Sequence, residues 1–164
     1  MRASLLIGVA GGQRSMTPLA AIALAAARDD LPAGTVVPRA MSHPGVVAGA
    51  ALLAVGEYVG DKRPDVPGRT TPGALTVRAG TSALAGGWVA PRGRAAEGAL
   101  LAVLTALASA HAGQRLRERA ADRFGALETA LVEDAATIGC AAAAIAAHRR
   151  DPAISEVDPE RLLP

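Results

Sequence analysis

The chain has 164 residues, the length of one domain, and its composition excludes several classes of protein. Hydrophobic residues make up 51% of the sequence, charged residues 20% and aromatic residues only 2%. A disordered chain would be poorer in apolar residues, and a β-sandwich or barrel would be richer in aromatic and β-branched ones. With Cys140 as the one cysteine, the chain cannot be a disulfide framework. The formal net charge of +2 and the lack of an aromatic–basic platform argue against nucleic-acid binding.

Five apolar stretches follow one another along the chain, separated by connectors rich in charge, proline or glycine. They cover residues 3–27, 44–60, 72–90, 98–113 and 130–147. A bilayer core needs roughly 17–25 helical residues, more than the ~11–12 residues of an average helix in a soluble domain. We therefore predict an all-α, integral membrane bundle of about four or five helices over residues 1–148, followed by a polar C-terminal tail over residues 149–164.

The first apolar stretch is interrupted by the motif GGQRSMTP at residues 11–18. Its glycines loosen the helix, its proline suits the first turn of a new helix, and Ser15 or Thr17 is placed to cap that helix. Backbone groups freed at a broken helix can bind ions or substrates, and an arginine there would favour an anion. A simple kink is the alternative. The motif predicts a broken or re-entrant N-terminal helix at Gly11, Gly12, Arg14, Ser15 and Pro18.

Four glycines lie along one ridge of the second stretch and form two GxxxG pairs. Small residues at this spacing let helix backbones approach closely in lipid. Chance in an alanine- and glycine-rich chain is the alternative explanation. We predict that helices pack, and that copies of the chain associate, at Gly45, Gly49, Gly56 and Gly60.

The same stretch ends in the densest polar motif of the chain, GEYVGDKRP. Glu57 and Asp61 are four residues apart and share one helix face, and Lys62 follows. Ionisable residues on a membrane helix are functional candidates, because burying them is costly. They would bind a cation, relay a proton or form a charge lock. Alternatively, the helix leaves the membrane near Glu57 and the later charges are interfacial.

A second acidic pair, Glu133 and Asp134, lies in the last apolar stretch. Adjacent helical residues point about 100° apart, so one acid can face the bundle while the other does not. His111 and Arg115, which share a helix face, are candidate partners. An N-terminal helical turn that complements the helix dipole is the alternative. Arg78, a lone cation in an apolar stretch, would pair with Glu57 or with this acidic pair, or extend to the surface.

Signatures of several enzyme classes are absent from the sequence. It contains no phosphate-binding P-loop, no HExxH zinc motif, no Glu-x-x-His pair and no GxSxG nucleophile elbow. The three histidines, His43, His111 and His148, show no metal-ligand spacing. We therefore expect no catalytic residues, no metal and no cofactor.

Taken in order, three motifs resemble those of a family of small bacterial membrane proteins known as domain of unknown function 4126. The likeness runs from residue 8 to about residue 147. It implies a multi-helix protein of the bacterial inner, or cytoplasmic, membrane and no particular activity. The motifs are G-x-R-S-x-x-P at Gly12, Arg14, Ser15 and Pro18; E-x-x-x-D-K-x-P at Glu57, Asp61, Lys62 and Pro64; and the pair Glu133–Asp134 after His111 and Arg115.

Three functions are compatible with these features. The first is a small carrier or channel-like module for an unidentified ion or solute, embedded in the lipid bilayer as a homo-oligomer. The second is a non-transporting membrane scaffold, in which the charges are structural ion pairs and the glycine ridge joins copies of the chain. The third is a soluble α-helical bundle, which the 20% of charged residues would favour.

Overall fold

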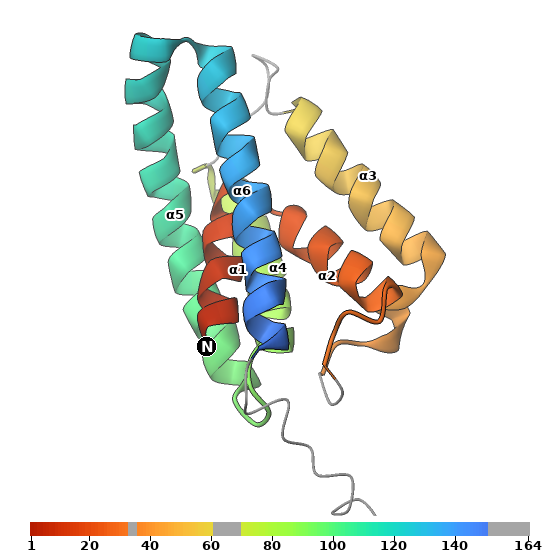
Figure 1. Ribbon diagram of the computed structural model, residues 1–164. Helices are drawn as coiled ribbons and strands as arrows, with labels where there is room; N and C mark the ends of the chain where they lie inside the picture. The colour runs from red at the N-terminus through yellow and green to blue at the C-terminus, as the bar shows by residue number, and fades with distance from the viewer. Residues whose placement is uncertain (33–35, 61–69, 151–164) are drawn as a thin grey trace, which may run out of the picture.

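A computed structural model of the protein describes residues 1–32, 36–60 and 70–150. These residues form six α-helices, one short 3-10 helix and no strand, which confirms the all-α prediction (Figure 1). The elements are α1 (Arg2–Gln13), α2 (Thr17–Ala27), η1 (Arg39–Ser42), α3 (Pro44–Gly60), α4 (Pro72–Trp88), α5 (Ala95–Phe124) and α6 (Ala126–Arg149).

The helix boundaries differ from the predicted stretches by a few residues at several ends and by more at two places. The first stretch is divided between α1 and α2, so the break is confirmed and the helix count rises to six. The predicted connector after residue 113 is helical, and α5 continues through it to Phe124. Residues 114–124 contain neither proline nor glycine, and their arginine, glutamate and alanine side chains favour a helix. The turn comes at Gly125, whose φ is 94°.

The predicted division into a helical domain and a polar tail stays a prediction, because most of the tail lies outside the described residues. Helix α6 ends at Arg149, one residue beyond the predicted boundary of the domain. Residues 151–164, which make up most of the predicted polar tail, lie outside the described residues.

Helix α1 is the centre of the bundle. It packs against α4, α5 and α6, while α2 packs against α3, η1 and α6. Figure 1 shows α5 and α6 as a long antiparallel hairpin, with α2 and α3 toward the other side of the molecule. Two isoleucines, Ile7 and Ile22, are fully buried, and alanine supplies most of the remaining core.

Small residues at every fourth position let α1 and α5 approach closely. Added Cβ atoms at Gly8 and Gly12 would meet α5 backbone oxygens at 2.5 and 2.3 Å, so glycine is required for this contact. Both helices follow the spacing that favours close packing. The buried small residues are Ser4, Gly8 and Gly12 on α1 and Gly98, Ala102, Ala106 and Ala110 on α5.

The glycines predicted to form a packing ridge lie on α3 and make no close helix contact within the described chain. Around a Cβ added at Gly49, Gly56 or Gly60 no atom of another element lies within 4 Å, and Gly45 meets only His43. The prediction that helices pack at these glycines is therefore wrong within the described chain, because the close contacts between helix backbones run through α1 and α5. Association of two copies through this face stays a prediction.

Two helices of the described chain, α5 and α6, are long and apolar enough to cross a membrane. Helices α2 and α3 are apolar but shorter. Large apolar side chains are exposed on several helices, with Leu52 at 72%, Val132 at 71% and Leu100 at 61%. Helix length thus identifies two candidate spans, and the multi-pass arrangement stays a prediction.

We expect Gly8→Ala to destabilise the protein, and Gly49→Ala to preserve or increase its stability. The methyl group at position 8 would collide with the backbone of Ala102, and overpacking of this kind costs about 1–3 kcal/mol. Gly49 lies in open space inside a helix, where alanine is favoured over glycine by about 1 kcal/mol. Thermal unfolding of the two purified variants makes the comparison. Equal stabilities would contradict the close α1–α5 packing.

Candidate functional site: charged residues at a broken helix

The break between α1 and α2 lies inside the bundle, where helix ends need protein partners. Arg14 follows α1 with an extended backbone, φ −140° and ψ 114°, and α2 begins at Thr17. The break leaves carbonyl groups of α1 and amide groups of α2 without intrahelical partners. Arg14 and Ser15 are buried, so side chains from other helices are the available partners.

Glu57, on α3, holds the amino-terminal end of α2. Its Oε1 accepts hydrogen bonds from the Ser15 amide at 2.7 Å and the Ser15 hydroxyl at 3.0 Å. Its Oε2 accepts a hydrogen bond from the Met16 amide at 2.9 Å. The carboxylate also faces the positive end of the α2 dipole. The predicted cap from Ser15 or Thr17 is therefore wrong, because Glu57 supplies the acceptor from another helix.

Arg78, on α4, binds the carboxyl-terminal end of α1, on the other side of the break. Its Nη1 donates to the backbone oxygens of Gly11 at 3.3 Å and Gly12 at 3.1 Å, which lie at the carboxyl-terminal end of α1. The same nitrogen lies 3.7 Å from Glu57 Oε1. One of the pairings predicted for Arg78 is thus confirmed. The pair places a cation at the negative end of α1 and an anion at the positive end of α2.

Arg14 forms a second buried ion pair, with Asp134 on α6. Arg14 Nη2 donates to Asp134 Oδ1 at 2.6 Å, and the two side chains are 1% and 13% exposed. The guanidinium also lies 5.2 Å from the centroid of the Tyr58 ring, within the range of a cation–π interaction. The Tyr58 hydroxyl shares a 2.9 Å hydrogen bond with Thr17 Oγ1. Residues of α2, α3 and α6 therefore meet around the break.

Two cations and two anions are paired at this site, which we call the break cluster. Unpaired, each charge would carry a desolvation cost of several kcal/mol, so removing one partner leaves the other in an unfavourable state. The members come from the break itself and from three other helices. They are Arg14, Glu57, Arg78 and Asp134.

The cations predicted to partner the acidic pair of α6 lie elsewhere. His111 and Arg115 are exposed on α5, and Asp134 pairs with Arg14 instead. Arg14 stood among the predicted residues as part of the broken-helix motif. The sequence did not indicate that this motif and the acidic pair, 120 residues apart, would meet.

The remaining predicted site residues are divided between a groove and the part of the chain that is not described. Asp61 and Lys62 lie outside the described residues. Glu133 points away from its neighbour Asp134 and lines a groove between α5 and α6, as the 100° step between adjacent helical residues requires.

Two polar residues at the site escaped the sequence analysis. Gln13 Nε2 donates to the backbone oxygen of Ser109 at 2.8 Å and to its hydroxyl at 2.7 Å, which fixes the end of α1 to α5. Tyr58 is the other. It is the one tyrosine of the chain and follows Glu57 directly, a signal that could have identified it.

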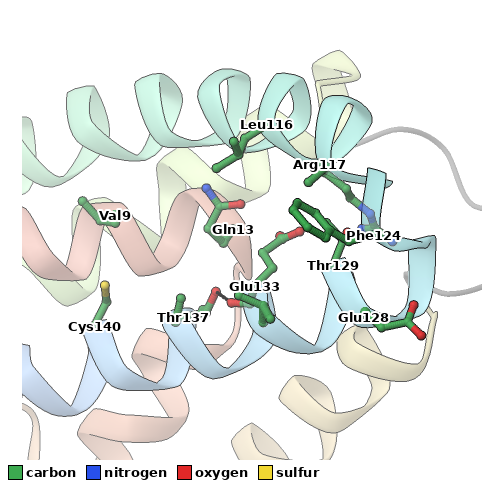
Figure 2. Close-up of a pocket in the computed structure, with 14 residues that line it drawn as sticks. Val9, Gln13, Leu116, Arg117, Phe124, Glu128, Thr129, Glu133, Thr137 and Cys140 are labelled. Atoms are coloured by element: carbon green, nitrogen blue, oxygen red, sulfur yellow. Dashed lines mark hydrogen bonds between the residues drawn. The ribbon is translucent and has the colours of Figure 1, made fainter. Parts of the chain in front are cut away.

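The groove has a volume of about 720 Å³ and reaches the end of α1 next to the break cluster. Figure 2 shows the Gln13 and Glu133 side chains extending into it from α1 and α6. Its large apolar lining residues are Val9, Leu116, Phe124 and Val132. Within residues 1–32, 36–60 and 70–150, no group of three or more His, Cys, Asp or Glu side chains is arranged to hold a metal ion.

Comparisons with known proteins return no relative of this chain. No family model, no curated protein and no solved structure matches it. The resemblance to domain of unknown function 4126 therefore stays a prediction that depends on the three motifs alone.

We expect Asp134→Asn to destabilise the protein by about 3–5 kcal/mol, because it leaves the Arg14 charge buried without its partner. The matched control is Glu97→Gln, which breaks the exposed Arg94–Glu97 pair, and exposed ion pairs contribute little to stability. Chemical denaturation of the purified variants measures both.

A double variant separates loss of the ion pair from loss of the fold. In Arg14→Leu/Asp134→Leu neither charge is left alone, so we expect much of the stability lost in the single variant to return. If Asp134→Asn were as stable as Glu97→Gln, the buried ion pair would not contribute as described.

Proposed function

We propose that the protein is a small carrier of the bacterial inner membrane, in which the break cluster is a charge lock that opens and closes. The observation that carries this proposal is the position of Glu57. Its carboxylate binds the amino end of α2 and, through Arg78, is joined to the carboxyl end of α1. Secondary carriers build ion and substrate sites from broken helices whose ends face charged groups.

The surface of the helices supports a membrane location. Helices α5 and α6 pass the length and hydropathy criteria for a span. Both also expose large apolar side chains, among them Leu104 at 58% and Ile138 at 55%. Soluble monomers rarely expose large contiguous apolar patches. In a bilayer these side chains would face lipid, and the paired charges of the break cluster would face the bundle interior.

The weak packing of α3 supports movement at the lock. Its contacts are mainly with α2 and η1, and Ala54 is its one buried residue among those described. Glu57 and Tyr58 provide the polar links between α3 and the break. Segments held by few buried contacts open at low free-energy cost. Outward movement of α3 would withdraw the Glu57 carboxylate and free the Ser15 and Met16 amides for an anion.

A second candidate function, a non-transporting membrane scaffold, is favoured by a different observation. Gly49, Gly56 and Gly60 of α3 have open space around them, so this face is available for close contact with another helix. In a scaffold the break cluster would be a structural feature, and the glycine face would join copies of the chain.

Flux measurements in proteoliposomes test the carrier proposal. The probes are protons, potassium and chloride, measured against protein-free vesicles. We expect one of these fluxes to exceed the background and Glu57→Gln to change its rate by about tenfold or more, since a charged acceptor at the break is lost. The control Glu97→Gln alters an exposed carboxylate, and we expect a change of less than about twofold.

Two results would contradict the proposal in different ways. Absence of all three fluxes from protein that sediments with membranes would exclude a carrier of these ions and favour the scaffold. Recovery of the protein in the cytosolic supernatant without detergent would overturn both membrane functions and favour a soluble bundle.

A further inference from the structure

The groove between α5 and α6 has an exposed apolar rim. Leu116 is 68% exposed, Phe124 69% and Val132 71%, which places them among the most exposed large apolar side chains described. The groove runs along α5 from Gly113 to Phe124, a distance of about 16 Å at 1.5 Å per residue. Its length and volume suit one alkyl chain.

A row of arginines borders the groove on the α5 side. Arg115, Arg119 and Arg123 follow one another at four-residue intervals and are all exposed. By the 100° step of a helix, they lie beside the groove-lining row of Leu116, Ala120 and Phe124. The acidic residues of this segment, Glu118 and Asp122, fall on the far side of the arginine row from the groove.

The charged residues that line the groove determine which of its two sides favours an anion. Helix α6 contributes Glu128 and Glu133 to the lining, and α5 contributes Arg117. The Glu128 carboxylate lies near Gly125, at the amino-terminal end of α6. An anionic group on a groove ligand is therefore favoured on the α5 side, where the cations are, and disfavoured against α6.

We infer that the groove holds one acyl chain of a phospholipid, whose phosphate lies against Arg115, Arg119 and Arg123 of α5. The inference rests on the proposed membrane location and goes beyond the break cluster. Clusters of basic residues next to a membrane helix attract anionic headgroups, and the apolar groove supplies the site for the chain. Gln13 and Glu133 line the groove and are the chain neighbours of Arg14 and Asp134, so the proposed lipid site lies next to the break cluster.

The number of lipid molecules that the purified chain retains tests the inference directly. The full chain, purified in an uncharged maltoside detergent, is mixed with phosphatidylglycerol or with an uncharged diacyl glycolipid, and bound lipid is counted by native mass spectrometry. We expect one phosphatidylglycerol per chain, retained at least about tenfold better than the glycolipid. Glycerol phosphate, which has the headgroup without chains, should not be retained.

Cys140 gives a second readout, because it lines the groove and is the one cysteine of the chain. A retained acyl chain should slow its alkylation by N-ethylmaleimide about tenfold, since the chain excludes the reagent from the groove. Glycerol phosphate should leave the alkylation rate unchanged.

Matched variants separate the groove from the rest of the surface. Ala136→Trp fills the groove and should abolish lipid retention, whereas Ala143→Trp, on an exposed part of α6 outside the lining, should preserve it. Changing the arginine row to glutamine should remove the preference for phosphatidylglycerol. As a control, three exposed arginines elsewhere are changed to glutamine, and this change should leave the preference for phosphatidylglycerol intact. The control residues are Arg28, Arg39 and Arg150.

The outcomes that overturn the inference are distinct from failure of the carrier proposal. Equal retention of both lipids would refute the phosphate contact, and retention unaffected by Ala136→Trp would refute the groove. Protection of Cys140 that rises with protein concentration in the absence of lipid would show a second copy as the occupant. Absent flux together with retained lipid would refute only the carrier, and flux without retained lipid would refute only the lipid site.

Discussion

A helix that breaks inside a bundle leaves amide and carbonyl groups that must find partners, and the fold of this protein is organised around that requirement. Glu57 accepts hydrogen bonds from the start of α2, and Arg78 donates to the end of α1. Arg14, within the break, pairs with Asp134. Helices α3, α4 and α6 are thereby each attached to the break by one charged side chain.

The helices at the centre of the bundle pack tightly, and the ion pairs lie at the edge of this packing, at the end of α1. With glycine and alanine at the contact, the helices approach so closely that even one methyl group at Gly8 would collide with the neighbouring backbone. The Arg14 and Arg78 side chains are only 1% and 6% exposed, so a charge that lost its partner there would cost far more than on the surface. Helix α3 is the exception, because few buried contacts hold it apart from those of Glu57 and Tyr58. That contrast between a rigid centre and a loosely held helix is the physical basis for the proposed charge lock.

Local features of the fold could be predicted from the sequence, whereas the pairing of distant segments could not. The break followed from glycine and proline at residues 11–18, and the importance of Glu57 followed from a carboxylate in an apolar helix. No local pattern indicates that Arg14 meets Asp134, since the choice among several candidate cations depends on how the helices pack. The glycine spacing of α3 was misleading for the same reason, because α1 and α5 carry small residues at the same interval and form the actual contact.

Amide hydrogen exchange at Ser15 and Met16 tests the central claim most directly, because Glu57 is the acceptor for both amides. In the wild-type protein these amides should exchange as slowly as those inside α2. Glu57→Ala should accelerate their exchange by about tenfold or more, and Glu97→Ala should leave it unchanged. Fast exchange in the wild-type protein, or slow exchange that persists in Glu57→Ala, would contradict a break held together by Glu57.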